Sequence, residues 1–448
     1  MKFKHLFLVL GIIAGTIFFI GCQKLDWKDH DDHGKGGGKQ GVFAEKADLA
    51  NDWYKLQLRF ILYSSPQYSN PIAIRLFAYE GIALYETLQP GMPYTISFSE
   101  NVYQMPVMPN PEKNKGYSWL LAANATLAFM TRNMLPNLTP ANKVSIDSLE
   151  KAYNDKLKPN SNSEVFARSQ SFGLAISQAV FDWSKTDKFD VANAAYTPPV
   201  FPGSWQPTPL AFAPAAVPYI KNCRPFFAGH TSGITPPFPI AYSEVVGSDF
   251  YNLEKGMYDL SKSLTDEQKA IALFWNDLGT GKGYTPPGHA ISIVLQIIEN
   301  EQLNLGLATM ALAKCGMGSW DGFIMVFRSK YEYNLLRPVT YIRKIFDPAW
   351  LSYINTPNHP EYPAAHAYVT SAAMQATASA IGNNHVFVDH TYDFLGYSPR
   401  SFKSLLAVGE ESGISRLYGG IHYLPSIQIG VKYGQEVGKN VGGLKMFK

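Results

Sequence analysis

The sequence predicts an all-α fold with little or no sheet. Apolar residues recur at intervals close to the helical period of 3.6 in long segments from residue 44 onward. Asparagine or threonine followed by proline precedes several of these segments, as is typical of helix starts. Only 94–98 has the character of a short strand. With 46% hydrophobic and 17% charged residues, the chain can bury a large core.

The first part of the chain contains five predicted helices. In the first, Leu49, Trp53 and Leu56 follow the helical period. The second begins at Asn70, whose side chain can cap the helix, and Pro71, which suits a first turn. The five segments are 44–63, 70–88, 117–134, 140–157 and 163–185.

Residues 189–243 have a different character, because prolines and aromatic residues alternate, as in Trp205-Gln-Pro-Thr-Pro. Proline removes backbone donors and blocks helix interiors, so we predict a long irregular connection. Its aromatic residues are expected to pack against the helices. Beyond it we expect helices at 265–278 after a cap at Ser263, at 287–305, at 306–330 as one helix or two, at 363–381, at 402–418 and from 425.

The N-terminus resembles a bacterial export signal. A short basic segment precedes an apolar run at 6–20, which is shorter than the roughly 20 residues that span a bilayer. The run ends at Gly21-Cys22, which resembles a lipobox, so we predict that 1–22 is a lipoprotein signal peptide with Cys22 as the lipidated residue. The alternatives are an ordinary signal peptide and an uncleaved anchor. A lipid anchor implies membrane attachment in the bacterial cell envelope, facing the periplasm or the surface.

The segment that follows, 23–41, is rich in aspartate, histidine, glycine and lysine, and is expected to be a flexible polar linker. The net charge of +3 is too small to indicate a nucleic-acid partner. Besides Cys22 the chain has Cys223 and Cys315. An oxidising envelope permits a disulfide between them, and two separate buried thiols are equally compatible with the sequence.

Cationic residues and histidines in the last part of the chain suggest an oxyanion site. They are arranged as Lys330-x6-Arg337-Pro, Pro-Ala-Ala-His366 and Ser-Arg416-x5-His422. Three cations converging on one point would be unfavourable without an anion among them. The two histidines would add a ligand or nucleophile and a proton carrier. The pattern therefore predicts a pocket for a tetrahedral oxyanion.

The spacing also predicts how these side chains meet. On one helix, positions seven apart differ by about 20° in azimuth, so we expect Lys330 and Arg337 on the same helix face. Pro363 is expected in the first turn of the next helix, which would place the free amides of Ala364 and Ala365 at an anion-binding terminus.

These residues resemble the signature of the vanadium-dependent haloperoxidases, which share their fold and site with type 2 phosphatidic acid phosphatases and bacterial acid phosphatases. The signature reads Lys-x6-Arg-Pro, Pro-Ser-Gly-His and Ser-Arg-x5-His-x3-Asp. Phe274-Trp275, Thr285-Pro-Pro-Gly-His289 and the segment 328–343 also resemble the bacterial haloperoxidase branch.

The resemblance implies a fold of two packed helical bundles within 42–448. The N-terminal bundle would span about 42–188 and the C-terminal, site-bearing bundle about 244–448. The irregular segment at 189–243 would connect them.

Roles for individual residues follow from the same resemblance. His422 would be the single protein ligand to vanadium, and His366 would be the acid–base residue. The vanadate oxygens, or those of a phosphate in the same site, would be bound by Lys330, Arg337, Ala365 and Arg416. His359 would lie on the halide side, which favours bromide or iodide. Vanadate would act as a Lewis acid that activates hydrogen peroxide.

Three positions depart from the signature. Ala364 replaces its serine and Ala365 its glycine. Ser426 replaces the aspartate that orients the ligand histidine, a contribution of roughly 10–100-fold in related metal sites. These departures predict weaker anion binding, and predict that Ala364→Ser with Ser426→Asp raises vanadate affinity.

Three functions remain open at this point. The first is a haloperoxidase that oxidises halide with hydrogen peroxide. The second is a phosphatase acting on a phosphate ester, in which His422 attacks phosphorus and His366 protonates the leaving alcohol. Loss of the orienting aspartate counts against the phosphatase. The third is a non-catalytic lipoprotein that retains a degenerate oxyanion site.

Overall fold

The computed structural model describes residues 41–277 and 282–448. Within these ranges it contains thirteen α-helices and one two-stranded sheet, which confirms the all-α class. The expected signal peptide at 1–22, with Cys22, lies outside the described residues, as does nearly all of the expected linker. In the described part of the chain no helix combines the length and apolarity needed to cross a membrane.

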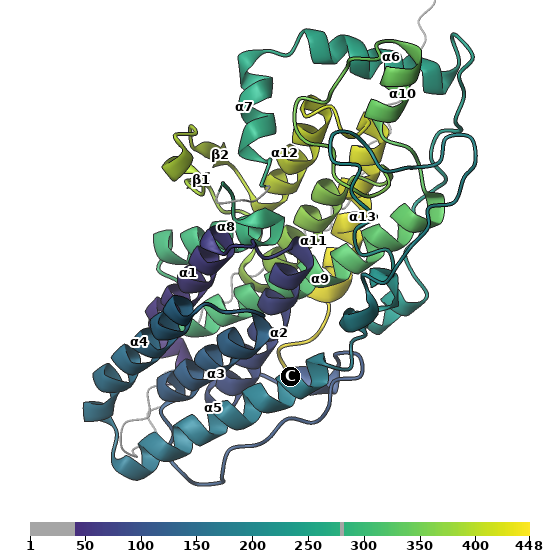
Figure 1. The fold of residues 1–448 in the computed structure, drawn as a ribbon. Coiled ribbons are helices and arrows are strands. Elements are labelled where there is room, and N and C mark those ends of the chain that lie inside the picture. The colour runs from purple at the N-terminus through teal and green to yellow at the C-terminus, as the bar shows by residue number, and fades with distance from the viewer. Residues whose placement is uncertain (1–40, 278–281) are drawn as a thin grey trace, which may run out of the picture. The chain divides into compact units, whose positions relative to one another are not determined.

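All five helices predicted before the connection are present. They are α1 (Asp48–Tyr63), α2 (Asn70–Leu88), α3 (Trp119–Met134), α4 (Pro140–Leu157) and α5 (Ser163–Ser184). The side chains of Ser118, Thr139 and Asn162 accept backbone N–H groups at the starts of α3, α4 and α5. α1 begins later than expected, because a short 3₁₀ turn precedes it. Figure 1 shows α3, α4 and α5 lying together, with α2 packed against α3 and α5.

Eight helices follow the connection. They are α6 (Asp249–Lys262), α7 (Asp266–Phe274), α8 (Thr285–Asn300), α9 (Leu305–Tyr333), α10 (Pro338–Ile345), α11 (Ala365–Ile381), α12 (Leu405–Tyr418) and α13 (Leu424–Gly442). The sequence did not predict α6 or α10. The expected cap at Ser263 is wrong, because Ser263 ends α6 and Thr265 caps α7 in a capping box with Gln268.

α9 is a single helix, one of the two alternatives that the sequence left open. A Cβ on Gly316 would lie 2.5 Å from the carbonyl oxygen of Phe77 in α2, and one on Gly318 would lie 2.6 Å from that of Ala372 in α11. The glycines therefore allow neighbouring helices to approach closely and do not break α9. α9 thus packs against both α2 and α11 (Figure 1). The residue boundaries of the two bundles stay a prediction.

The segment 189–243, all of it described, contains short 3₁₀ turns and neither α-helix nor strand. Its Trp205 and Phe226 side chains are fully buried. The predicted irregular structure and the packing of its aromatic residues are therefore confirmed, whereas its role as the connection between two bundles stays a prediction.

The sheet pairs β1 (Phe387–Asp389) with β2 (Arg400–Phe402) in antiparallel register. It was not predicted, and because β2 ends at Phe402 the helix expected at 402–418 begins only at Leu405. The expected strand at 94–98 is wrong. Tyr94 has a left-handed backbone (φ 61°), and Thr95 forms only an isolated bridge with Phe447.

Candidate functional site

Lys330 and Arg337 reach the site from different elements. α9 ends at Tyr333, Asn334 adopts a left-handed conformation (φ 49°), and Arg337 lies immediately before α10. The expectation that both cations share one helix face is therefore wrong, because Asn334 turns the chain between them. Both side chains are nevertheless fully buried in the same region.

Backbone carbonyls hold these two cations. Lys330 Nζ donates to the carbonyl oxygens of Pro360 and Glu361, each at 2.8 Å. Arg337 donates from Nε to the carbonyl oxygen of His359 at 2.8 Å and from Nη1 to that of Ile421 at 2.9 Å. Burial lowers the pKa of Arg337 to about 10, and burial together with Arg337 lowers the pKa of Lys330 well below its ordinary value. An anion between the two would oppose both shifts.

His422 lies between a carboxylate and a guanidinium. Its Nδ1 is 2.9 Å from Glu361 Oε1, and its Nε2 is 3.1 Å from Arg337 Nη1. Arginine can only donate, so Nε2 must accept and Nδ1 must carry the proton. Burial, Arg337 and Lys330 all lower the pKa of His422 well below its ordinary range. The result is a neutral imidazole whose Nε2 lone pair faces the cations.

Arg416 is the third buried cation. It lies in the last turn of α12 and donates from Nη2 to the carbonyl oxygen of Trp275. Gly420, with φ 74°, turns the chain after α12 and returns it to His422. Arg416 lowers the pKa values of His366 and His422, as expected for a charge close to both.

The start of α11 differs from the prediction. The helix begins at Ala365, so Pro363 is outside its first turn and Ala364 is the residue before it. The amide of Ala364 donates to the carbonyl oxygen of Ser426 at 3.2 Å and is not free. The amide of Ala365, as the first in the helix, has no intrahelical acceptor and can still bind an anion.

His366 lies one residue into α11 and faces Asp277. Its Nε2 is 3.5 Å from Asp277 Oδ2, and within the described part of the chain neither atom has a hydrogen-bond partner. Burial and Arg416 lower the pKa of His366 to about 4, although Asp277 acts in the opposite direction.

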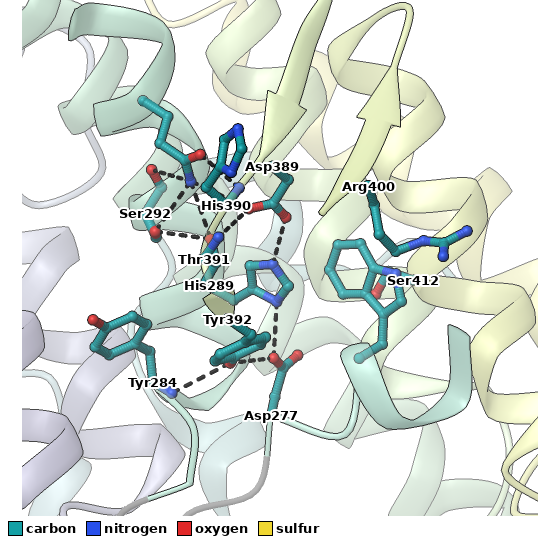
Figure 2. A network of polar contacts seen from close by, with 12 residues as sticks. Asp277, Tyr284, His289, Ser292, Asp389, His390, Thr391, Tyr392, Arg400 and Ser412 are labelled. Carbon is teal, nitrogen blue, oxygen red and sulfur yellow. Dashed lines mark hydrogen bonds and ion pairs between the residues drawn. The ribbon is translucent and has the colours of Figure 1, made fainter. Parts of the chain in front are cut away.

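Asp277, which faces His366, also belongs to a buried network of polar contacts (Figure 2). His289 in α8 places Nδ1 2.8 Å from Asp277 Oδ1 and Nε2 2.8 Å from Asp389 Oδ2, and Tyr392 donates to the same Asp277 oxygen at 2.6 Å. Burial opposes a charge on His289, but the two carboxylates outweigh it and raise the pKa to about 10. His289 is therefore an imidazolium between two carboxylates.

Trp275 connects this network to the cations. Its ring stacks on His289 with 4.3 Å between ring centroids, while its carbonyl oxygen accepts from Arg416. The Phe274-Trp275 and Thr285–His289 motifs therefore supply residues that contact Asp277 and Arg416 and so support the site.

A pocket opens onto these residues. Ala365, His366, His422 and His359 line it, and its other walls are mainly apolar, including Phe323. His359 accepts from Arg337 Nη2 at 3.0 Å, and its ring contacts Phe327. The site residues predicted from the sequence thus converge, except that the amide of Ala364 is already bonded.

Sequence reasoning missed four supporting residues. They are Glu361, Asp277, His289 and Asp389. The only signal for these supporting roles was the residue type, since carboxylates that become buried normally need partners. Which residues pair could not be predicted, because the pairs join distant segments and have no fixed spacing. Cys223 and Cys315 are both buried and free, so of the two alternatives the structure has separate thiols.

The chain is similar to known proteins in both sequence and structure. Residues 343–446 match the family described as the VCPO second helical-bundle domain. The chain is similar to a bacterial vanadium-dependent iodoperoxidase structure, with 27% identity, a TM-score of 0.82 and coverage of 92% of this chain and 99% of that one. No curated protein sequence matches.

Two bacterial vanadium-dependent chloroperoxidase structures share the fold at 16% identity. The apo form has a TM-score of 0.63 and covers 83% of this chain and 92% of its own. The holo form has a TM-score of 0.61 and covers 93% and 96%.

Proposed function

We propose that this chain, which belongs to the vanadium haloperoxidase superfamily, is a vanadium-dependent haloperoxidase that oxidises iodide or bromide with hydrogen peroxide. The observation that carries the proposal is a neutral imidazole, His422, whose Nε2 lone pair faces buried cations. A metal oxyanion requires an electron-pair donor for the metal, here one imidazole, and N–H donors for its oxygens, here several cations.

The donors left over fit a tetrahedral oxyanion. Lys330 uses two of its three N–H groups on carbonyls. Arg416 uses its Nε and one Nη2 donor, so most of its five N–H groups are available. Ala365 offers its amide, and His366 Nε2 has no hydrogen-bond partner in the described part of the chain.

Each residue would then have a separate task. His422 would bind vanadium through Nε2, and the cations with the Ala365 amide would bind the oxygens. His366 would hold or release a proton at Nε2, the atom that faces Asp277. Bound vanadate supplies a Lewis acid that activates hydrogen peroxide toward halide.

The pocket favours a large, weakly hydrated halide. Its walls are mainly apolar, and His359 is one of the two polar side chains of the pocket that contact Arg337. Similarity to an iodoperoxidase structure supports iodide or bromide over chloride.

The test uses the purified protein incubated with orthovanadate. We expect vanadate-dependent oxidation of iodide and bromide by hydrogen peroxide, lost in His422→Ala and strongly reduced in Lys330→Ala. Lys55→Ala, which changes an exposed lysine paired with Glu299 far from the site in sequence, is the matched control. Absence of halide oxidation in a folded, vanadate-loaded protein would rule the proposal out.

A phosphatase is the second candidate, favoured by one observation. Glu361 accepts from His422 Nδ1, so the imidazole has a carboxylate partner despite Ser426. The objection that a nucleophilic histidine would lack support is therefore removed. Release of phosphate from an aryl phosphate without vanadate, lost in His422→Ala, would favour this reading. Absence of activity in both assays would favour the third function, a non-catalytic lipoprotein.

We also propose attachment to the bacterial cell envelope through a lipid on Cys22, from the resemblance of Gly21-Cys22 to a lipobox. Cys22→Ser should move the protein from the membrane to the soluble fraction after cell lysis. Retention of the variant in the membrane would favour an uncleaved anchor.

A further inference from the structure

We propose that Glu361 is a positioning residue for His422 and that Ser426 completes its placement. The carboxylate that the superfamily signature has at position 426 is then supplied from a different segment of this chain. This inference rests on the proposed function, because His422 is the imidazole proposed to bind vanadium.

The carboxylate of Glu361 is fully buried and has donors on both oxygens. Oε1 accepts from His422 Nδ1 at 2.9 Å and from the amide of Tyr423 at 3.1 Å. Oε2 accepts from Ser426 Oγ at 2.8 Å. All three donors lie between residues 422 and 426, so one carboxylate holds the whole turn that carries the imidazole.

The backbone of Glu361 is fixed as well. Its amide donates to the carbonyl oxygen of Leu335 at 2.9 Å, and its own carbonyl accepts from Lys330 Nζ at 2.8 Å. Leu335 lies in the link between α9 and Arg337. The main chain of Glu361 is therefore hydrogen-bonded to Lys330, and its side chain is hydrogen-bonded to His422. Together these bonds set the direction of His422 Nε2 relative to Lys330 and Arg337.

Ser426 is the complement that this arrangement requires. A serine hydroxyl donates to Glu361 Oε2, whereas a carboxylate at 426 only accepts and would leave that buried oxygen without its hydrogen bond. Ser426→Asp alone is therefore expected to weaken the site, contrary to the expectation from the signature. It should help only when residue 361 can itself donate a hydrogen bond, as the amide of Glu361→Gln can.

The experiment compares Glu361→Gln, Ser426→Asp and the double variant with the unmodified protein. Vanadate affinity is measured by fluorescence titration, and the hydrogen bond at His422 Nδ1 by the NMR chemical shift of the Nδ1 proton in the vanadate-free protein. Glu361→Gln should weaken vanadate binding about 10–100-fold. It should also move the Nδ1 proton upfield, because an amide oxygen is a weaker hydrogen-bond acceptor than a carboxylate. Ser426→Asp should also weaken binding, and the double variant should recover at least part of the loss.

Glu254→Gln is the matched control. Glu254 is also buried, and its carboxylate accepts from the hydroxyl of Tyr423, next to His422 in sequence. It does not touch the imidazole, so its replacement should leave vanadate affinity and the Nδ1 proton shift unchanged. If Glu361→Gln fails to fold, Ser426→Ala provides the readout, because it removes one hydrogen bond from Glu361 and should weaken binding about 2–10-fold.

Wild-type vanadate affinity together with a wild-type Nδ1 proton shift in Glu361→Gln would overturn the inference, as would failure of the double variant to improve on Glu361→Gln. If the unmodified protein binds no vanadate, the proposed function fails. The Nδ1 proton shift of His422 still decides the positioning role in that case, because a change in Glu361→Gln supports it and no change refutes it.

Discussion

The two site histidines have different carboxylate support. The Glu361 carboxylate accepts directly from His422 at 2.9 Å, and the other donors to this carboxylate are neutral. Asp277 lies 3.5 Å from His366 and is already bonded to the imidazolium of His289. One imidazole is therefore held in a single direction, while the other faces a carboxylate without being bound by it.

The difference matches two chemical needs. A ligand imidazole must point one lone pair at one atom, so it benefits from a direct partner on the opposite nitrogen. An acid–base imidazole must exchange a proton, so a strong and permanent partner would hold that proton in place. His289 lets Asp277 remain ionised without bonding tightly to His366, because the imidazolium supplies the compensating charge.

The largest effect that would sharpen this comparison is expected from His289→Gln. Removing the imidazolium takes away the cation that lies between the buried carboxylates of Asp277 and Asp389, which should cost about 3–5 kcal/mol of unfolding free energy. Denaturant unfolding measures the loss. An unchanged unfolding midpoint would show that His289 is neutral and that the comparison is wrong.

The same residue predicts a pH dependence. The folded pKa of His289 is raised to about 10, above its ordinary value of 6.5. Its contribution to stability is therefore fully present below pH 6.5 and is lost as the pH rises toward 10. Unfolding free energies measured across that window should fall in the unmodified protein, and this component of the slope should be missing in His289→Gln.

A smaller effect, on catalysis, is expected from Asp277→Asn. Halide oxidation should fall about 100-fold, in the range for loss of a general acid–base function, whereas vanadate affinity should change far less than in Glu361→Gln. Asp277 raises the pKa of His366, which is about 4, so its loss should move the acidic limb of the rate profile to lower pH. Equal losses of vanadate affinity in the two variants would break the distinction between the histidines.

The smallest effect is expected from Ala364→Ser. Ala364 is fully buried directly before α11, and the variant restores the hydroxyl of the superfamily signature. One added hydrogen bond to the oxyanion should tighten vanadate binding about 2–10-fold. Ala367→Ser, one turn further into α11, is the control and should give no gain in the same titration.

Much of this fold was predictable because its signals are local. Capping residues such as Thr139 and Asn162, and the apolar period of α1, depend only on neighbours in sequence. The five site side chains were also predictable, because their order and spacing match a known signature. The glycines of α9 were ambiguous, since the sequence does not reveal that Gly316 lies against Phe77.

The supporting contacts were not predictable for the same physical reason. Glu361 holds His422 across 61 positions of sequence, and Asp389 reaches His289 across 100. No helical or strand period relates residues so far apart. Asn334 is a local feature that was also not predictable. Its left-handed backbone redirects the chain before Arg337, and nothing in the spacing of Lys330 and Arg337 indicates this turn.

The close approach of α9 to α2 bears on how the chain can be divided. Lys330 projects from α9, whose Gly316 lies against Phe77 of α2. A fragment beginning after the irregular connection would expose this face of α9 to water, because α2 would be missing. α2 therefore supports the helix that carries Lys330, although the two helices are far apart in the sequence.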